Sequence, residues 1–295
     1  MRRPIIVMFL SLFLMACQAF AAERGALFKA THGAHTLYLY GTMHAGRADF
    51  YPLEPRIRAA LAAAPTLALE IDAARDPAAM LAAFQRHGMF AAGSPGMAGL
   101  PPDRRLRIET GLKAQGVDPA AVAQLKPWMV VTMLALLDMG KLGYDPAFGV
   151  DDHLAQLARN TRTRIAELES VDYQAALMNR LPLDEQWRLL EETLEHMASG
   201  RALREGREIV EAYERADGAA LDRIARRIEG DDTLGGTFMR DVMLKERNGP
   251  MADKVASLLA RENNAVVAVG LLHLLGNNGV PELLRQRGIR VERVY

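Results

Sequence analysis

Cysteine is almost absent from this chain, since Cys17 is the only one in 295 residues. A single thiol excludes an intrachain disulfide framework and a thiolate zinc site, and its N-terminal position leaves no cysteine nucleophile for catalysis. An excess of one charge is absent too, because 36 acidic residues balance 36 basic ones. Without a basic patch the sequence offers no footprint for nucleic acid, and we expect no nucleic-acid partner.

The chain also lacks an apolar N-terminal run long enough for a comfortable membrane span. Two arginines precede the apolar segment 4–16, and Ala-Phe-Ala at 19–21 offers small residues for cleavage. We therefore predict a signal peptide over residues 1–21 and a periplasmic or secreted mature protein. A transmembrane anchor is one alternative. Another is membrane attachment through lipidation of Cys17, because Leu-Met-Ala-Cys resembles the lipid-attachment signal of bacterial lipoproteins.

Half of the residues are hydrophobic, as in an ordinary globular protein. Two alternating runs at 26–30 and 36–40 flank a His-Gly turn signal and predict a hairpin. Further strand-like runs lie both early and late in the chain, at 66–72, 164–168, 265–271 and 289–295.

Most of the sequence between these runs has helical periodicity. We therefore predict an α/β (α+β) fold in which a mixed β-sheet is built from both ends of the chain and flanked by helices. Residues 22–295 would form a single domain with a large helical insertion at about 76–262. The Met/Leu stripe at 128–139 within it is typical of core packing.

Two strand-like runs end in the same pattern, Gly-x-x-His. The first is Gly41-Thr42-Met43-His44, and the second is Gly270-Leu271-Leu272-His273. A histidine in this position lies at the edge of the sheet, in the crevice where α/β proteins tend to bind ligands. Each motif alone is a weak signal, because a lone histidine is more often structural. The repetition of the motif strengthens the functional interpretation.

Glu70 closes the apolar run that lies between the two motifs. Two histidines and a carboxylate are the ligands of many hydrolytic divalent-metal sites, in which an open position holds water. We predict His44, Glu70 and His273 as metal ligands, with Glu70 as ligand or general base. Asp72 is either a residue that handles protons beside the metal or a helix N-cap.

Together with these residues, several short segments occur in an order that resembles the TraB/GumN family, which includes the Tiki proteases. They are 38–44, 69–70, 149–151, 168–170, 247–248 and 269–276. The resemblance implies a divalent-metal-dependent peptidase that acts on a peptide or protein substrate. It also implies that Mn or Co supports activity, with Zn as a further option, and that the fold is related to ChaN-like and erythromycin-esterase-like proteins.

The resemblance also places Arg247 and Asn248 in the same cleft as catalytic residues. An arginine there would hold an oxyanion or a substrate carboxylate. The alternative for Arg247 is a surface ion pair with Glu246 or Asp241.

These observations lead to one main functional hypothesis, a secreted or envelope-associated divalent-metal-dependent hydrolase that acts as a peptidase. A haem- or metal-binding envelope protein without hydrolytic activity is the alternative. A third interpretation is an interaction protein that keeps the fold without its chemistry.

Overall fold

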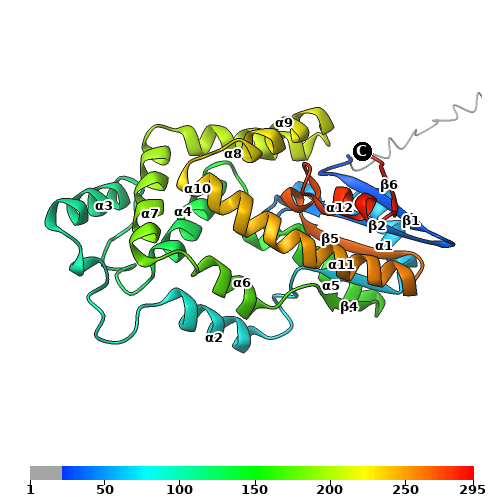
Figure 1. The fold of residues 1–295 in the computed structure, drawn as a ribbon, viewed down its shortest axis with the longest axis horizontal. Helices are drawn as coiled ribbons and strands as arrows, with labels where there is room; N and C mark the ends of the chain where they lie inside the picture. The colour runs from blue at the N-terminus through cyan, green and yellow to red at the C-terminus, as the bar shows by residue number, and fades with distance from the viewer. Residues whose placement is uncertain (1–21) are drawn as a thin grey trace, which may run out of the picture.

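The computed structural model describes residues 22–295. The predicted signal peptide and Cys17 lie outside the described residues. The fold is α/β, as predicted, and contains a six-stranded mixed sheet in the order β4-β3-β5-β2-β1-β6 (Figure 1). The strands are β1 (Leu27–His32), β2 (His35–Thr42), β3 (Thr66–Leu69), β4 (Arg164–Glu167), β5 (Ala265–Gly270) and β6 (Arg290–Arg293).

Both ends of the chain contribute to this sheet. β1 and β2 form the predicted hairpin, with His32 opposite His35 and Gly33 in the left-handed region at φ 58°. β1 also pairs antiparallel with β6, and β2 pairs parallel with β5. The prediction that early and late segments meet in one sheet is therefore confirmed.

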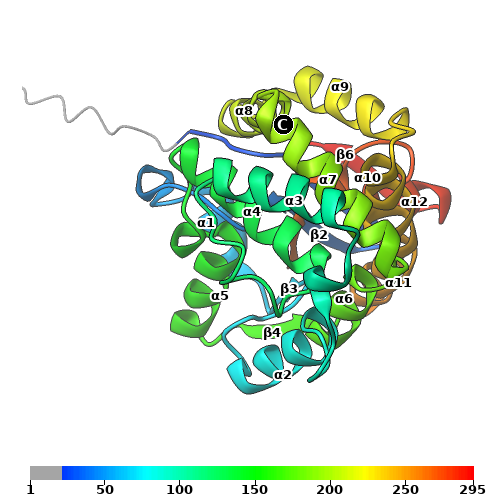
Figure 2. The same cartoon turned by 90° about the vertical axis from the view of Figure 1, so that its left-hand side faces the viewer.

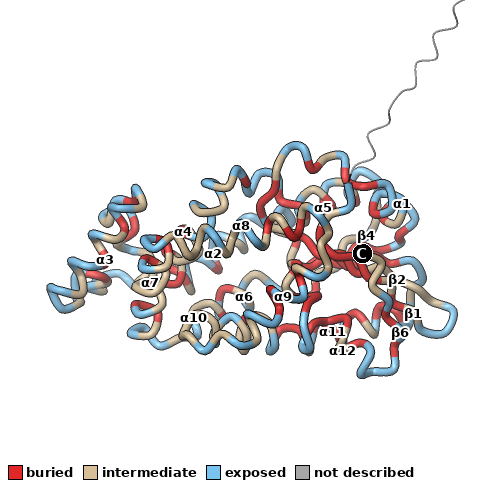
Figure 3. Tube along the Cα trace, turned by 90° about the horizontal axis from the view of Figure 1, so that it is seen from above, coloured by how far each residue is buried: buried red, intermediate tan, exposed pale blue. Residues whose placement is uncertain are grey.

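Helices cover both faces of the sheet (Figures 1 and 3). α1 (Pro55–Ala63) and α5 (Val150–Thr161) pack on one face. α11 (Glu246–Arg261) and α12 (Val280–Gln286) pack on the other. Because both faces are covered, β5 is a continuous apolar run, Ala-Val-Val-Ala-Val, whose residues are all buried.

A lobe of helices extends from one edge of the sheet, and Figure 2 looks onto it. It contains α2 (Pro77–Gly88), α3 (Pro102–Ala114), α4 (Pro127–Lys141), α6 (Val171–Met178) and α7 (Leu183–Ala198). The lobe has its own apolar core, in which Ile108, Leu134 and Leu190 are fully buried.

The remaining helices connect this lobe back to the sheet. They are α8 (Arg201–Glu214), α9 (Gly218–Glu229), α10 (Leu234–Thr237) and a π-helix (Phe238–Lys245) that leads into α11. Within the stretch 76–262 the chain is mostly helical, but α5 and β4 return to the sheet. Among residues 22–295, no helix combines the length and the apolar character that crossing a membrane requires.

The parallel strands β2, β3, β4 and β5 all point their carboxyl ends at the same edge of the sheet. The residues that follow these four strands therefore gather in one place. They include His44, Glu70, Glu169 and His273.

The glycine of the first motif serves close packing. A Cβ on Gly41 would lie 2.8 Å from Leu271 Cδ1 and 3.2 Å from Leu271 Cα. Leu271 begins the 3₁₀ turn Leu271–Leu274 that carries His273. The absence of a side chain on β2 therefore lets the second histidine motif approach the first.

We predict that Gly41→Ala destabilises the fold by about 1–3 kcal/mol, because the added methyl group overpacks this contact. Gly140→Ala is the matched control, since no atom lies within 4 Å of a Cβ there. The control should be neutral or slightly stabilising, because alanine is the better helix former. Urea denaturation measures both variants, and equal midpoints would contradict the prediction.

Candidate metal centre and cavity

The three predicted ligands lie around one point, the position that a Cβ on Gly270 would occupy. A Cβ on this glycine would lie 3.1 Å from Glu70 Oε1, 3.7 Å from His44 Nε2 and 3.7 Å from His273 Cδ2. His273 Nε2 is itself 3.7 Å from Glu70 Oε1. The glycine of the second motif thus leaves open the space that all three residues border.

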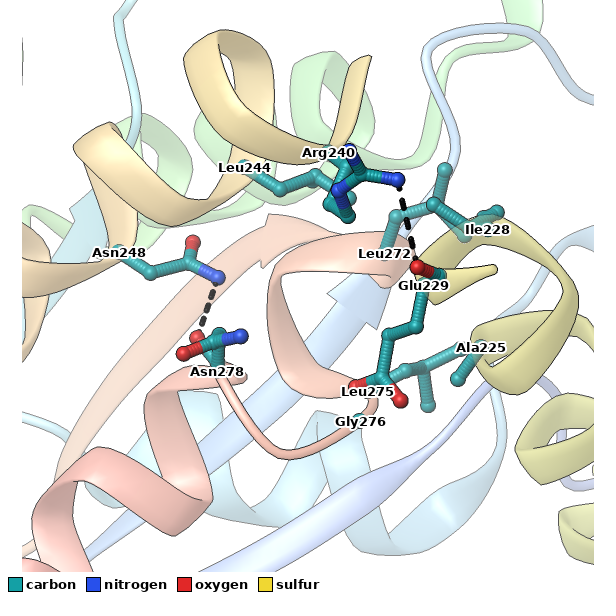
Figure 4. Close-up of a pocket in the computed structure, with 10 residues that line it drawn as sticks. All are labelled: Ala225, Ile228, Glu229, Arg240, Leu244, Asn248, Leu272, Leu275, Gly276 and Asn278. Atoms are coloured by element: carbon teal, nitrogen blue, oxygen red, sulfur yellow. Dashed lines mark hydrogen bonds between the residues drawn. The ribbon is translucent and has the colours of Figure 1, made fainter. Parts of the chain in front are cut away.

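His273 is held by Asn248. The side-chain nitrogen of Asn248 donates to the carbonyl oxygen of Asn278 at 2.7 Å (Figure 4). This leaves Asn248 Oδ1 as the acceptor for His273 Nδ1, 2.5 Å away. Because an amide oxygen only accepts, the proton lies on Nδ1, and Nε2 presents a lone pair towards Glu70.

The electrostatic surroundings keep His273 neutral. Burial, aided by the charge of Arg247, outweighs the attraction of Glu70 and lowers the pKa of His273 to about 4. Asn248 is not among the residues that line the cavity of about 520 Å³ at the strand ends. It lines a separate hollow of about 30 Å³ together with Leu275 and Gly276. Figure 4 shows these residues.

His44 is held in a similar way by Asp151, whose Oδ1 lies 3.2 Å from His44 Nδ1. The backbone supports this contact, because the N–H of Val150 donates to the carbonyl oxygen of Met43 at 2.9 Å. The segment 149–151 therefore fastens the loop that carries His44. Its Nε2 is left to face the space at Gly270.

The two histidines differ in charge. Burial acts to lower the pKa of His44, but the hydrogen bond and charge of Asp151, together with the charge of Glu70, raise it to about 9. Since 66% of the His44 side chain is exposed, loss of hydration is small there, and the carboxylates determine the direction of the shift.

Glu70 is buried and ionised. Its Oε1 accepts from the backbone N–H of Gly270 at 2.6 Å, and its Oε2 accepts from Arg247 Nη2 at 2.5 Å. Burial acts to raise its pKa, but the positive charge that His273 acquires in acid, the charges of His44 and Arg247 and the Gly270 N–H lower the pKa to about 2. Such a carboxylate is better suited to be a ligand than a general base.

Arg247 lies between two buried carboxylates. Besides Glu70, it donates from Nη2 to Glu169 Oε2 at 2.7 Å and from Nε to both Glu169 oxygens at 3.1 Å. Its Nη1 donates to the carbonyl oxygen of Met243 at 3.2 Å. Arg247 is 5% exposed and does not line the cavity, so in this structure it orients Glu70.

The other carboxylates named from the sequence have separate roles. Glu246 pairs with Arg180, and Asp241 pairs with Arg240, so neither binds Arg247. The buried carboxylate of Asp72 pairs with Arg159, whose side chain is 40% exposed. The N-cap of α2 is Asp76, so the N-cap interpretation of Asp72 is wrong.

Sequence reasoning gave Glu169 and Gln174 no role. Glu169 follows β4 just as Glu70 follows β3, and its N–H donates to the carbonyl oxygen of Glu70 at 2.8 Å. A carboxylate directly after a strand was a signal that could have found it. Gln174 on α6 donates from Nε2 to Glu70 at 3.2 Å and to Glu169 at 2.8 Å.

A cavity of about 520 Å³ lies between the strand ends and helices α2, α4 and α6. Its polar lining residues are Thr42, His44, Glu70, Thr132, Asp151, Asp152 and Gln174. Its larger apolar residues are Ile71, Met80, Phe84, Trp128, Leu136, Val171 and Met178. Within the predicted core stripe, Val130 and Leu134 are buried in the lobe core, whereas Leu136 lines the cavity.

The metal site stays a prediction. In the part of the chain that the structure describes, no group of three or more His, Cys, Asp or Glu side chains is spaced to hold a metal ion. The donor chemistry nevertheless fits, because each histidine offers Nε2 while an oxygen fixes its Nδ1, and Glu70 is ionised. His44 would have to lose its proton before it could bind a metal.

We predict that Arg247→Met destabilises the fold by about 3–5 kcal/mol at neutral pH, because it leaves two buried carboxylates unpaired. With its pKa lowered to about 2, Glu70 stabilises the native chain above its ordinary pKa, and this stability disappears as the pH falls towards 2. The variant lacks the pairing, so the difference between its free energy of unfolding and that of the parent chain should shrink in acid. Urea denaturation of both chains at neutral and acidic pH measures this difference. A difference that does not change with pH would contradict the prediction.

We also predict that histidine NMR titration finds His273 neutral with its proton on Nδ1, and His44 with a pKa of about 9. Asp151→Asn should move the pKa of His44 back towards 6.5. Asp172→Asn is the control, because Asp172 contacts the distant His87 at 3.0 Å. An unchanged His44 titration in Asp151→Asn would show that Asp151 does not control its charge.

Comparison with known proteins agrees with the family resemblance. The sequence model of the TraB/PrgY/gumN family matches residues 26–293. The uncharacterized protein YbaP of Escherichia coli (strain K12) is 26% identical over 258 residues, which cover 86% of this chain and 89% of that protein. YbaP of Shigella flexneri is 26% identical over 253 residues, covering 84% and 87%. No solved structure matches significantly.

The matched range covers the positions of both histidine motifs, Glu70 and the Arg247-Asn248 pair. The chain belongs to the TraB/PrgY/gumN family.

Proposed function

We propose that this protein is a divalent-metal-dependent hydrolase that cleaves peptide bonds. The observation that carries the proposal is the arrangement around Gly270. There Glu70 and two histidines, each anchored through Nδ1, border one space beside a large cavity. Metal-binding histidines in proteins are commonly oriented by just such a partner on the second ring nitrogen.

In this proposal His44, His273 and Glu70 hold the metal, with Mn, Co or Zn as the candidates. The bound ion would supply a polarised carbonyl and a water of lowered pKa. Asn248 and Asp151 keep the two imidazoles in orientation, and Arg247 holds the Glu70 carboxylate in place.

The family resemblance suggested that Arg247 stabilises an oxyanion, but its contacts support a positioning role better. Its donors are engaged by Glu70, Glu169 and the Met243 carbonyl. The apolar wall of the cavity would limit access of water to the reacting groups. A periplasmic or secreted location, with or without lipid attachment at Cys17, remains part of the proposal and depends on residues 1–21.

Metal content tests the proposal directly. After the chain that lacks residues 1–21 is reloaded with Mn, Co or Zn, mass spectrometry should find near-stoichiometric metal. The double variant His44→Ala, His273→Ala should bind metal at least about tenfold more weakly, because it loses two ligands. His32→Ala, at the exposed hairpin turn, is the control and should keep its metal.

A peptide-cleavage screen on the loaded protein then tests hydrolysis, which should stop on chelation. Equal absence of metal in all variants would overturn the proposal. A haem absorption band that depends on His44 and His273 would instead favour the haem-binding alternative.

A further inference from the structure

A buried hydroxyl in the cavity lacks a partner. Thr42 is 1% exposed, and its Oγ1 has no hydrogen bond within residues 22–295. Thr42 is the last residue of β2 and lines the cavity beside His44 and Glu70. Leaving such a group unsatisfied costs about 1–3 kcal/mol. A ligand that bonds to this hydroxyl would remove the cost.

Two further groups offer acceptors to the cavity. Gln174 uses its Nε2 for Glu70 and Glu169, so its Oε1 stays available. Asp152, the second residue of α5, also lines the cavity. Asp151 pairs with His44. Asp152 forms no ion pair within residues 22–295.

Positive charge is scarce in this lining. The cavity residues include no lysine or arginine within the described chain. His44 and Glu70 are the proposed metal ligands and Asp151 contacts His44, which leaves Asp152 as the remaining carboxylate of the lining. The remaining carboxylate and amide oxygen therefore complement a ligand that carries hydrogen-bond donors and a positive charge.

The side chains that α2 and α4 contribute to the cavity suit an apolar group. Met80 and Phe84 come from α2, and Trp128 and Leu136 come from α4. Phe84 and Leu136 remain 38% and 42% exposed. Apolar side chains that line a cavity of about 520 Å³ and still meet solvent are typical of a binding site for a small organic ligand.

We propose that the cavity binds the amino-terminal end of a peptide, with the free α-amine held by Asp152, Gln174 and Thr42 and an apolar first side chain against the α2–α4 wall. A primary ammonium supplies three donors. This inference rests on the proposed function for its chemistry. Hydrolysis there would break the first amide C–N bond, with water supplying the hydroxyl to the carbonyl carbon and a proton to the leaving amine.

Binding of small probes tests this inference without requiring cleavage. L-leucinamide carries the amine and the apolar chain, N-acetyl-L-leucinamide lacks the charge, and glycinamide lacks the side chain. Calorimetry and tryptophan fluorescence report binding, because Trp128 lines the cavity whereas Trp187 is buried in the lobe core. We expect L-leucinamide to bind at least about tenfold more tightly than either comparison ligand, as expected for one lost charged or apolar contact.

Asp152→Asn should remove the preference for the free amine and keep the preference for leucine over glycine. The control is Asp232→Asn, whose side chain is 95% exposed and does not line the cavity. It should bind like the parent chain. The ligand comparison in the parent chain stands even if Asp152→Asn fails to fold.

Equal binding of the free and acetylated amides, or no binding of either, would overturn the inference. A preference that survives in a folded Asp152→Asn would overturn the role of Asp152. If the amine preference is found but no peptide is cleaved in the loaded protein, the proposed hydrolysis fails while the recognition stands.

Discussion

The site depends on the buried guanidinium of Arg247, which bridges Glu70 after β3 and Glu169 after β4. Two carboxylates this close and this buried would repel each other and take up protons without a cation between them. With Arg247 present, Glu70 stays ionised and turns one oxygen to the Gly270 N–H and the histidine side of the site. A surface ion pair would contribute little, whereas breaking this buried one is costly.

Two further pairs extend the same principle. Asp151 holds His44, and Asn248 holds His273, each through Nδ1. One partner is an anion and the other a neutral amide, so two histidines from equivalent motifs carry different charges: the pKa of His44 is raised and that of His273 is lowered. The site is asymmetric in charge although its two motifs are alike in sequence.

The two motif glycines also differ in purpose. Gly41 makes room for Leu271, so that the loops after β2 and β5 can approach each other. Gly270 leaves open the space that the three predicted ligands border.

Strand periodicity and turn residues act locally, so three features were predictable from the sequence. They are the hairpin, the meeting of both chain ends in one sheet and the position of the histidines after parallel strands. The contacts of Arg247 were not predictable, since a sequence pattern does not specify which distant charges become neighbours.

By itself the sequence determined the strands, the helical character of the middle of the chain and the pairing of Gly-x-x-His with Glu70, because apolar spacing and residue chemistry are local properties. Only the tertiary structure decided that Arg247 binds Glu70 and Glu169, which are 177 and 78 residues away. It also placed the unpartnered Thr42 hydroxyl and Asp152 in one cavity with an apolar wall. These neighbours come from strand order and helix packing, and burial then sets their pKa values and their hydrogen-bond requirements.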